Sequence, residues 1–342
     1  MIEDKYQTDL RRIITPDFAR FFKGQRILIS GASGLMGTHF TLLFQLFNQF
    51  FQGEVQLSVI SKTGNFPFVL TKDVAIIQQD LTKVNVSKLL GNFDSVIHCA
   101  GYGQPAKFQS EKLKTIHLNT TTTIELSRLV TDSGSFLFMS TSEVYSGLTN
   151  PPFQEWQIGT TNTDHPRSSY IESKRAGEAI IVALRDEFPK MVASSARLAL
   201  AYGPGAKGGD SRVLYELISR GLTKKEIVLS DSGSAIRTYC FVSDAIEQCI
   251  AILMRGKDHV YNVGGNSQIT IADLASKIGK IINVPVRIPK VKETFLLDAP
   301  LEVRLDLTKI EELSGKKEYV NIDLGLEETI LWMKHNLNKV KI

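Results

Sequence analysis

Short apolar runs alternate with helical patterns along the first half of the chain, and this alternation constrains the fold more than any other feature. The runs cover residues 26–30, 55–61, 74–79, 95–100 and 136–141. Runs of this kind suit strands that are buried on both faces of a parallel sheet. Longer helical patterns lie between and after them, notably at residues 35–51, 112–131 and 169–187. The alternation predicts an α/β fold built on a doubly wound, Rossmann-type parallel sheet.

The regular alternation of apolar runs and helical patterns gives way to mixed short elements after about residue 200, which suggests a division into domains. We expect an N-terminal extension at 1–24, with a short helix laid on the body of the protein. A dinucleotide-binding Rossmann domain is predicted at 25–200, and residues 239–265 are expected to return to it. A smaller α/β substrate-binding lobe is predicted from 201–238 and 266–342, ending in a helix near 325–336.

A glycine-rich turn, Gly31 to Gly37, follows the first apolar run directly and leads into an apolar helical pattern. The glycines permit a tight turn and a close approach of the backbone to a pyrophosphate at the start of the helix. Because the turn opens the first strand–helix unit, it predicts a dinucleotide site. The residues expected to contact the cofactor in this turn are Gly31, Ser33, Gly34, Leu35, Met36 and Gly37.

The ends of the later runs add further candidate contacts. Asp80 and Leu81 follow the third run and are expected near the adenine. Cys99, Ala100 and Gly101 end the fourth run and are expected to form a floor of small residues beneath the cofactor. We interpret the preceding His98 as a core histidine rather than a catalyst.

The second run leaves the choice between NAD and NADP open. It ends at Ser61 and Lys62, where a site that prefers NAD usually offers an acidic residue to the ribose hydroxyls. Ser61 and Lys62 suit the 2′-phosphate of NADP, and they suit a solvated strand end equally well. We therefore expect NAD as the cofactor, with NADP as the alternative.

Tyr170 and Lys174 lie four residues apart in a helical pattern and share one helix face. An ammonium beside a phenol favours the phenolate, so the tyrosine can act as a base near neutral pH. Moving a tyrosine pKa from about 10 to about 7 requires about 4 kcal/mol, whereas an exposed ion pair contributes about 0–1 kcal/mol. Lys174 alone is therefore insufficient, and the pair requires a sheltered site with a cationic nicotinamide nearby.

The glycine turn, the run STSEVY at 140–145 and the Tyr170/Lys174 pair resemble the extended short-chain dehydrogenase/reductase family, the NAD-dependent epimerases and dehydratases. The resemblance extends from Arg26 to the C-terminus. Within the family, the chain is most similar to UDP-glucuronate decarboxylases, also called UDP-xylose synthases. The stretches that carry this similarity are 140–145, 165–175, 210–218 and 233–245. The Thr-Ser-Glu of the first stretch is also found in GDP-mannose 4,6-dehydratases.

The resemblance implies catalytic roles for five residues. Tyr170 would take the proton of the sugar C4 hydroxyl as hydride leaves for the nicotinamide. Lys174 would bind the nicotinamide ribose, and Thr141 would hydrogen-bond the reacting hydroxyl. Glu143 would remove the C5 proton in a dehydratase or assist proton handling at C5 in a decarboxylase. Ser142 stands where TDP-glucose dehydratases carry an acidic residue, which disfavours their particular mechanism.

The resemblance also implies binding residues. Arg237 matches an arginine that the family places at the diphosphate or the sugar, and a guanidinium suits bidentate recognition of either anion. Arg212 and Arg304 are lesser candidates for the same anion. Asn119 resembles an asparagine near the family's active site and is grouped with the cofactor contacts.

Two further positions depart from the decarboxylase pattern and put the identity of the sugar in doubt. Gly205 stands where these enzymes continue their Tyr-Gly-Pro loop with arginine, and Ser146 replaces a glycine after Tyr145.

Composition excludes several classes of protein. A net charge of +4 over 342 residues is too diffuse to indicate a nucleic-acid binder. Residues 1–12 lack the apolar segment of a secretory signal, and polar residues interrupt the apolar stretch 40–51, so no membrane span is expected. The three cysteines are isolated, which indicates buried thiols of a reducing compartment and no metal site. We expect a cytoplasmic protein.

Together these features predict an NAD(P)-dependent enzyme that acts on a nucleotide-diphosphate sugar through a 4-keto intermediate. Decarboxylation of UDP-glucuronate is the best interpretation, with 4,6-dehydration or 4-epimerisation as alternatives. A non-catalytic dinucleotide-binding sensor is disfavoured because Tyr170 and Lys174 are both present. By resemblance alone, we expect a homodimer formed through the helical patterns at 112–131 and 169–187.

Overall fold

Seven parallel strands form the central sheet of the protein, in the order β3-β2-β1-β4-β5-β6-β10. The computed structural model describes residues 2–83, 86, 91–206, 209–289 and 302–339. The strands are β1 Arg26–Ser30, β2 Gln56–Ser61, β3 Ala75–Gln78, β4 Phe93–His98, β5 Val130–Thr141, β6 Val192–Leu198 and β10 Val260–Val263. The order reverses between β1 and β4, and ligands of doubly wound sheets bind at such a switch point. The fold class expected from the sequence is confirmed.

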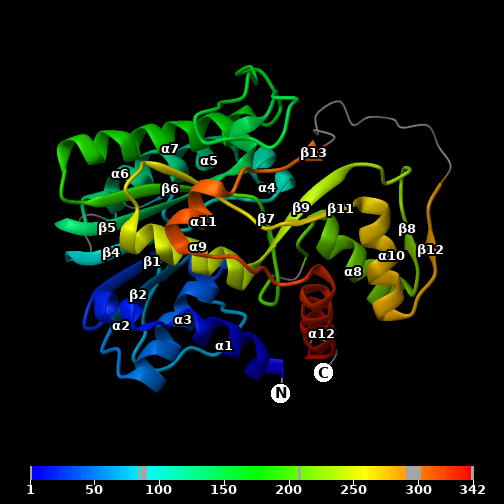
Figure 1. Ribbon diagram of the computed structural model, residues 1–342, viewed down its shortest axis with the longest axis horizontal. Helices are drawn as coiled ribbons and strands as arrows, with labels where there is room; N and C mark the ends of the chain where they lie inside the picture. Colours follow the sequence, from blue (N-terminus) through cyan, green and yellow to red (C-terminus); the bar gives the residue numbers. More distant parts are fainter. Residues whose placement is uncertain (1, 84–85, 87–90, 207–208, 290–301, 340–342) are drawn as a thin grey trace.

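Helices cover both faces of this sheet, as Figure 1 shows. One face packs against the N-terminal helices and against α3, α9 and α11, and the other packs against α5, α6 and α7. These helices, with the short α4, are α3 Leu35–Phe51, α4 Pro105–Ser110, α5 Lys112–Asn119, α6 Thr121–Ser127, α7 Ser168–Glu187, α9 Val242–Arg255 and α11 Thr308–Ser314. Six of these strands are therefore mostly buried, as their apolar runs indicated. The edge strand β3 is mostly exposed, which the run at 74–79 did not indicate.

The single helix expected at 112–131 is two helices followed by a strand. Thr120 separates α5 from α6 with φ −117° and ψ −78°, and β5 already begins at Val130. Four threonines in a row, Thr120 to Thr123, lower the helix propensity here because β-branched side chains lose rotamer freedom in a helix. Apolar spacing alone did not reveal this break.

The N-terminal extension forms two helices, α1 Ile2–Arg12 and α2 Pro16–Phe22. Thr15 caps α2 by accepting a hydrogen bond from the Phe18 backbone at 3.2 Å, and Pro16 occupies the first helical position. Phe18 and Phe22 are buried against Phe44 of α3, with ring centroids 5.9 Å and 5.1 Å from it. The extension is therefore an integral part of the core rather than a surface attachment.

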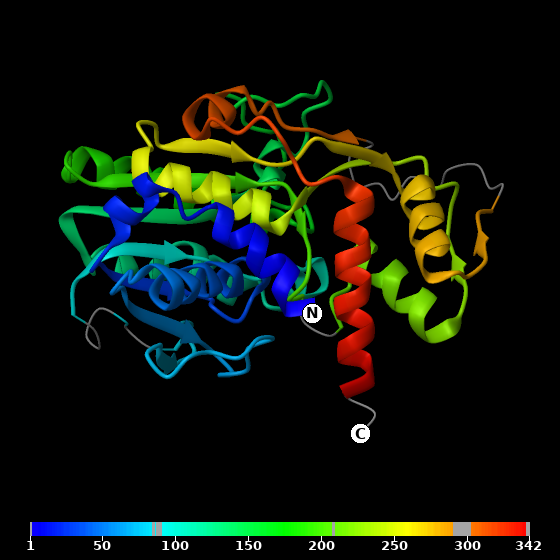
Figure 2. The same ribbon diagram turned by 60° about the horizontal axis from the view of Figure 1, so that its bottom comes forward.

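A second group of elements lies beyond one end of the large sheet. Its sheet has the order β11-β9-β13, with β7 also paired to β9, and a two-stranded sheet pairs β12 with β8. The elements are β7 Leu200–Tyr202, α8 Val213–Lys224, β8 Ile227–Val228, β9 Ile236–Phe241, β11 Ser267–Thr270, α10 Ile271–Ile282, β12 Val286–Arg287, β13 Glu302–Val303 and α12 Ile322–Lys339. In Figure 2, α12 stands between the helices of the large sheet and the pair α8 and α10.

The division of the chain into domains at 25–200 and 201–238 stays a prediction, and residues 207–208, 290–301 and 340–342 of the expected lobe lie outside the described residues. Across the part of the chain that is described, no helix is both long and apolar enough to span a bilayer.

We predict that Phe22→Ala lowers the free energy of unfolding by about 3–5 kcal/mol, because the change leaves a cavity in a packed aromatic cluster. Phe50→Ala is the matched control, since Phe50 is half exposed and contacts Arg11 through a cation–π interaction worth about 0.5–1 kcal/mol. Urea denaturation measures both. Equal losses for the two variants would contradict burial of the N-terminal helices.

Candidate active site

The turn between β1 and α3 lies against the end of β4, at the switch point of the sheet. Gly31 has φ +67°, and a Cβ atom there would lie 2.5 Å from the backbone nitrogen of Ala100. A Cβ atom on Gly37 would lie 2.5 Å from the carbonyl oxygen of Gly31. Gly34 is the N-cap of α3 and provides no side-chain cap, so the first amides of this 17-residue helix are available to an anion. The turn therefore fits a pyrophosphate.

Hydrogen bonds and an ion pair hold the side chains at the ends of β2 and β3. Ser61 donates a hydrogen bond to the hydroxyl of Ser33 at 3.0 Å, and its own oxygen accepts the Gly64 amide at 3.2 Å. Lys62 forms an ion pair of 2.9 Å with Asp80. Burial acts to raise the pKa of Asp80, but hydrogen bonds from Lys62 and Thr82 outweigh it and lower the pKa to about 2. The basic residue that suits a 2′-phosphate is thus already paired with a carboxylate.

Leu81, the second residue predicted at the adenine, is buried in the core between the sheet and α6. Leu35 and Met36 form the first turn of α3 and pack with the core on the opposite face.

His98 is a core histidine. Its Nδ1 lies 2.7 Å from the hydroxyl of Ser30, and its Nε2 lies 3.0 Å from the carbonyl of Leu118. Because a carbonyl can only accept, Nε2 carries the proton and Nδ1 accepts from Ser30. Burial, with the nearby charge of Lys174, lowers the pKa of His98 to about 3, so the ring stays neutral.

Small residues after β4 leave room beside the reactive groups. Cys99 is partly buried, and burial raises the pKa of its thiol to about 12. Ala100 donates to the Ser30 hydroxyl at 3.3 Å. A Cβ atom on Gly101 would lie 3.4 Å from Asn119 Oδ1 and 3.5 Å from Lys174 Nζ. The predicted floor of small residues therefore borders both Asn119 and Lys174.

Asn119, at the end of α5, has a buried side-chain oxygen, Oδ1, that faces Gly101. Its amide nitrogen donates to the hydroxyl of Ser173 at 2.9 Å, and the side chain is fully buried. Its Oδ1 atom has no hydrogen-bond partner among the described residues. A buried acceptor in this state fits a bound group with a hydroxyl or amide to donate, such as a cofactor.

Tyr170 and Lys174 lie on the buried face of α7, 7% and 4% exposed. Lys174 Nζ donates to the carbonyl of Met139 at 2.5 Å and lies 6.0 Å from the centroid of the Tyr170 ring. Burial raises the pKa of Tyr170 to about 12 and lowers the pKa of Lys174 to about 7. In this state burial disfavours the charged form of both groups.

The helical turn η2, Ser142–Tyr145, follows β5 and carries the other candidate catalytic residues. Thr141 caps it by accepting the Glu143 backbone amide at 3.2 Å, and a hydrogen bond with Thr141 also acts to lower the pKa of Tyr170. Glu143 is held by two hydrogen bonds from Arg167, one of them 2.8 Å long. The sequence reasoning missed Arg167, although it lies one helical turn before Tyr170.

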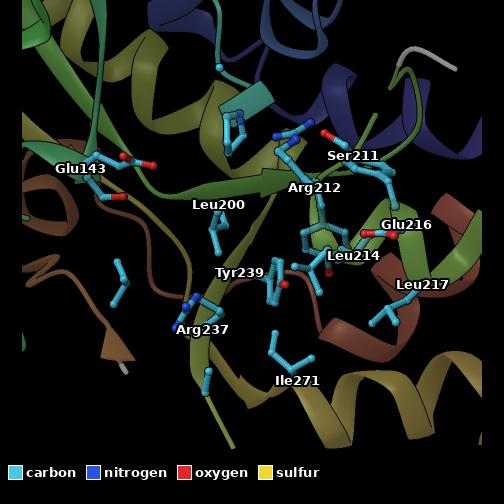
Figure 3. A pocket seen from close by; sticks show the side chains of 18 of the residues that line it. Glu143, Leu200, Ser211, Arg212, Leu214, Glu216, Leu217, Arg237, Tyr239 and Ile271 are labelled. Carbon is cyan, nitrogen blue, oxygen red and sulfur yellow. The ribbon is translucent and has the colours of Figure 1, made fainter. Parts of the chain in front are cut away.

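A cavity of about 480 Å³ opens beside η2, a size within the usual range for small-molecule pockets. Figure 3 shows Glu143, Arg212 and Arg237 around it, contributed by η2, the start of α8 and β9. Arg212 is paired with Asp210 at 2.7 Å. Arg237 donates to the carbonyl of Ile236 at 2.7 Å, and burial lowers its pKa. Its position at the cavity is compatible with contact to an anion.

Two more of the predicted site residues differ in their relation to the cavity. Arg304 pairs with Glu302 at 2.9 Å and lies outside the described lining of the cavity, which Val303 joins in its place. Ser142 lines the cavity beside Glu143. No group of three or more histidine, cysteine, aspartate or glutamate side chains in the described ranges is arranged to hold a metal ion.

A buried polar network supports η2, and no local sequence pattern indicates it. Arg197 of β6 pairs with Glu178 of α7 at 2.7 Å, and Glu178 accepts a 2.5 Å hydrogen bond from Ser140. Arg197 also donates to the hydroxyl of Tyr145, which in turn donates to Asn262 of β10 at 2.7 Å. Both ends of the segment 140–145 are therefore tied to the sheet.

A family model described as the NAD dependent epimerase/dehydratase family matches residues 27–264. The chain belongs to this NAD-dependent family. The match spans the glycine turn, η2, the helix that carries Tyr170 and Lys174, and β10. The glycine cradle, the open start of α3 and the unpartnered Asn119 oxygen fit the NAD on which the family depends.

Individual relatives agree with this assignment. "UDP-glucuronic acid decarboxylase 5" of Arabidopsis thaliana is 27% identical over 309 residues, covering 88% of this chain and 87% of the relative. Among solved structures, a UDP-N-acetylglucosamine 4-epimerase from Methanobrevibacter ruminantium M1 superposes with a TM-score of 0.78 at 19% identity, covering 92% and 99% of the two chains. A UDP-glucuronic acid 4-epimerase from Bacillus cereus, solved with UDP-glucuronic acid and NAD, gives a TM-score of 0.74 at 22% identity, covering 91% and 99%.

We predict a pH-dependent stability difference between Lys174→Met and the wild type in the absence of cofactor. Between pH 7 and 10.5 the unfolded wild type binds a proton at Lys174 that the folded protein has lost, so wild-type stability rises with pH across this window. The stability advantage of the methionine variant should therefore shrink by up to about 1.4 kcal/mol per pH unit. Urea denaturation across this range measures it, with the exposed Lys280→Met as control. A constant difference would contradict the burial of an ionisable amine.

Proposed function

We propose that this protein is an NAD-dependent nucleotide-sugar enzyme that decarboxylates UDP-glucuronate through a 4-keto intermediate. The observation that carries the proposal is the position of Glu143, at the cavity and within electrostatic range of both Tyr170 and Arg237. The relatives named UDP-glucuronic acid decarboxylase, matched over most of their length, support the same reaction. Free cysteines at Cys99, Cys240 and Cys249 support a cytoplasmic location.

Tyr170 is proposed as the base that accepts the proton of the C4 hydroxyl. When bound, NAD supplies the acceptor for the C4 hydride, which it later returns, and a positive charge near the phenol. Moving the Tyr170 pKa from about 12 to about 7 requires about 7 kcal/mol of preferential phenolate stabilisation. The hydrogen bond from Thr141 and the charges of Arg167 and Arg212 already act to lower this pKa against burial. The whole of the further stabilisation has to arise on ligand binding.

The C4 ketone makes the neighbouring carboxylate a β-keto acid. Cleavage of the bond between C5 and the carboxyl carbon releases CO₂, and its electron pair becomes the enolate of C5, C4 and the C4 oxygen. Thr141 and protonated Tyr170 are the proposed donors to that oxygen, in the manner of an oxyanion site. Glu143 is proposed to assist proton handling at C5. We propose Arg237, with Arg212 as a second candidate, for the diphosphate.

Two other reactions use the same residues. A 4,6-dehydratase would use Glu143 to remove the C5 proton, whereas a 4-epimerase would only rotate the 4-keto sugar before reduction. A dinucleotide sensor without turnover is disfavoured, since Tyr170 and Lys174 are both buried on one helix face at the predicted cofactor floor.

Mass spectrometry of the products tests the proposal directly. The protein is incubated with NAD and, separately, with UDP-glucuronate, GDP-mannose, TDP-glucose and UDP-N-acetylglucosamine. Loss of CO₂ from UDP-glucuronate supports the decarboxylase. Loss of water from a neutral sugar would replace it with a dehydratase, and an isobaric product separated by chromatography would replace it with an epimerase.

We predict that Tyr170→Phe reduces turnover by about 10²–10⁴-fold or more, because a phenyl ring cannot accept the C4 proton. NAD binding, measured by calorimetry, should be retained. Tyr319→Phe is the matched control, because the Tyr319 hydroxyl donates to Glu311 of α11. Unchanged turnover in the Tyr170 variant would sink the assignment of the base.

We also propose that the protein is a homodimer formed through α5, α6 and α7. Apolar side chains are exposed on these helices, namely Leu113 at 82% together with Ile116, Ile124 and Val182. Exposed apolar groups that cluster on neighbouring helices favour association.

The dimer proposal predicts that the wild type sediments as a dimer at micromolar concentration and that Leu113→Glu converts it to a monomer. A charge at this position would have to be buried in the interface. Leu331→Glu on α12, which is equally apolar and half exposed, should leave the dimer intact. A monomeric wild type would rule the interface out.

A further inference from the structure

Arg167 stands directly before α7 and forms a forked pair with Glu143. One hydrogen bond of 2.8 Å joins its Nε to Oε2, and a second joins Nη2 to Oε1. The two side chains are only 20% and 26% exposed, and both line the cavity. A planar fork of this kind fixes the orientation of the carboxylate as well as neutralising its charge.

The same guanidinium reaches Tyr170 through one aromatic ring. Arg167 lies over Phe108 of α4, with its Cζ 5.3 Å from the ring centroid. Phe108 is fully buried and stacks face to face on Tyr170, with centroids 4.5 Å apart and ring planes 4° apart. Arg167 thus contacts one candidate catalytic group directly and supports the ring of the other.

The charges of the pair act on Tyr170 in opposite directions. Burial is the main cause that raises the Tyr170 pKa; the Glu143 carboxylate raises it further, and the Arg167 guanidinium lowers it. The same two charges also act on Arg237 of β9, where Glu143 favours the charged guanidinium and Arg167 disfavours it. The other charged or titratable groups near Tyr170, or on the elements that pack against α7, are Lys174, Arg212, Lys107, Lys112, Lys114, His117, Glu125, Tyr145, Arg197 and Asp132.

We propose that Arg167 is a positioning residue of the active site, which holds Glu143 in one orientation and cancels the negative charge that Glu143 would otherwise impose on the Tyr170 phenolate and on an anionic substrate. The effect on the substrate rests on the proposed function, because it requires a sugar that carries a carboxylate. The effect on Tyr170 does not depend on which sugar is bound.

The proposal predicts how the pKa of Tyr170 changes in three variants. Arg167→Gln leaves the Glu143 anion without its partner, so Tyr170 should deprotonate at a higher pH. One unit charge at short range in a partly buried site corresponds to about one pH unit. The double variant Glu143→Gln/Arg167→Gln loses both charges, so the pKa of Tyr170 should return close to that of the wild type. Arg167→Lys restores the charge without the fork and should recover most of the shift.

Arg175 of α7 provides a matched control. It pairs with Glu172 at 2.7 Å and donates to the backbone carbonyls of Val144 and Gly159 at 2.7 Å and 3.0 Å. It therefore supports η2 mechanically without contacting Glu143 among its described bonds. Arg175→Gln should lower the melting temperature but leave the pH dependence in place, which separates a structural role from an electrostatic one.

The test is the pH dependence of NAD reduction by UDP-glucuronate in a single turnover, followed by the absorbance of the reduced nicotinamide. The ascending limb should move up by about one pH unit in Arg167→Gln and return in the double variant. Measured by calorimetry, Arg167→Gln should bind UDP-glucuronate at least about fivefold more weakly than the wild type, while its affinity for UDP is unchanged. A limb that coincides with the wild type, or a double variant displaced as far as the single one, overturns the proposal.

A second readout separates failure of this inference from failure of the proposed function. Proteins labelled with ¹³C at the tyrosine Cζ are titrated by NMR with NAD bound, and the Tyr170 signal is identified by its loss in Tyr170→Phe. If the wild type does not oxidise UDP-glucuronate, the proposed function fails, and this titration alone decides the role of Arg167. A Tyr170 signal with the same pH response in the wild type and in Arg167→Gln overturns that role.

Discussion

The buried ion pair between Arg197 and Glu178 is the interaction on which the geometry of the active site depends. Two charges removed from water are stable only when further hydrogen bonds satisfy them. Here Ser140 bonds Glu178, while Tyr145 and the carbonyls of Glu155 and Gln157 bond Arg197. The network thus joins β5, β6, α7 and η2 at one place. Glu143 and Thr141 lie between its two anchor points, Ser140 and Tyr145, so their backbone positions are fixed before any ligand binds.

The second constraint is the contact between the β1–α3 turn and the end of β4. Gly31 packs so closely on Ala100 that no side chain fits between them. This contact places the start of α3, the small residues 99–101 and the buried face of α7 around the switch point of one parallel sheet. A dinucleotide at the turn and a sugar in the adjacent cavity would then meet near Tyr170.

The electrostatics of the site are set by opposing effects rather than by a single pair. Burial disfavours the phenolate of Tyr170 and the ammonium of Lys174, and it does so more strongly than any one charged neighbour compensates. Lys174 is bonded to the Met139 carbonyl, so its influence on the tyrosine is indirect. The arginines at the cavity carry the positive charge that the site offers in the absence of ligands, and Glu143 determines how much of it reaches the phenol.

Much of the fold could be read from the sequence, because strand and helix periodicities are local and survive without knowledge of partners. The five apolar runs mark the cores of β1 to β5, and the patterns at 35–51 and 169–187 match α3 and α7. The glycine spacing and the Tyr170/Lys174 pair likewise led to the family, because each motif acts over a few consecutive residues. The interruption of the helix pattern at Thr120 was missed, since apolar spacing does not register where a helix stops.

The tertiary structure alone decided which charges meet. Arg167 reaches Glu143 across 24 residues, Arg197 reaches Tyr145 across 52, and Lys62 reaches Asp80 at the ends of neighbouring strands. It also decided that the N-terminal helices belong to the core, by packing Phe18 and Phe22 against α3. The sequence by itself determined the type of sheet and the chemistry that the motifs can perform. The partners of each charged group depend on distances set by the packing of whole layers, and no local pattern encodes those distances.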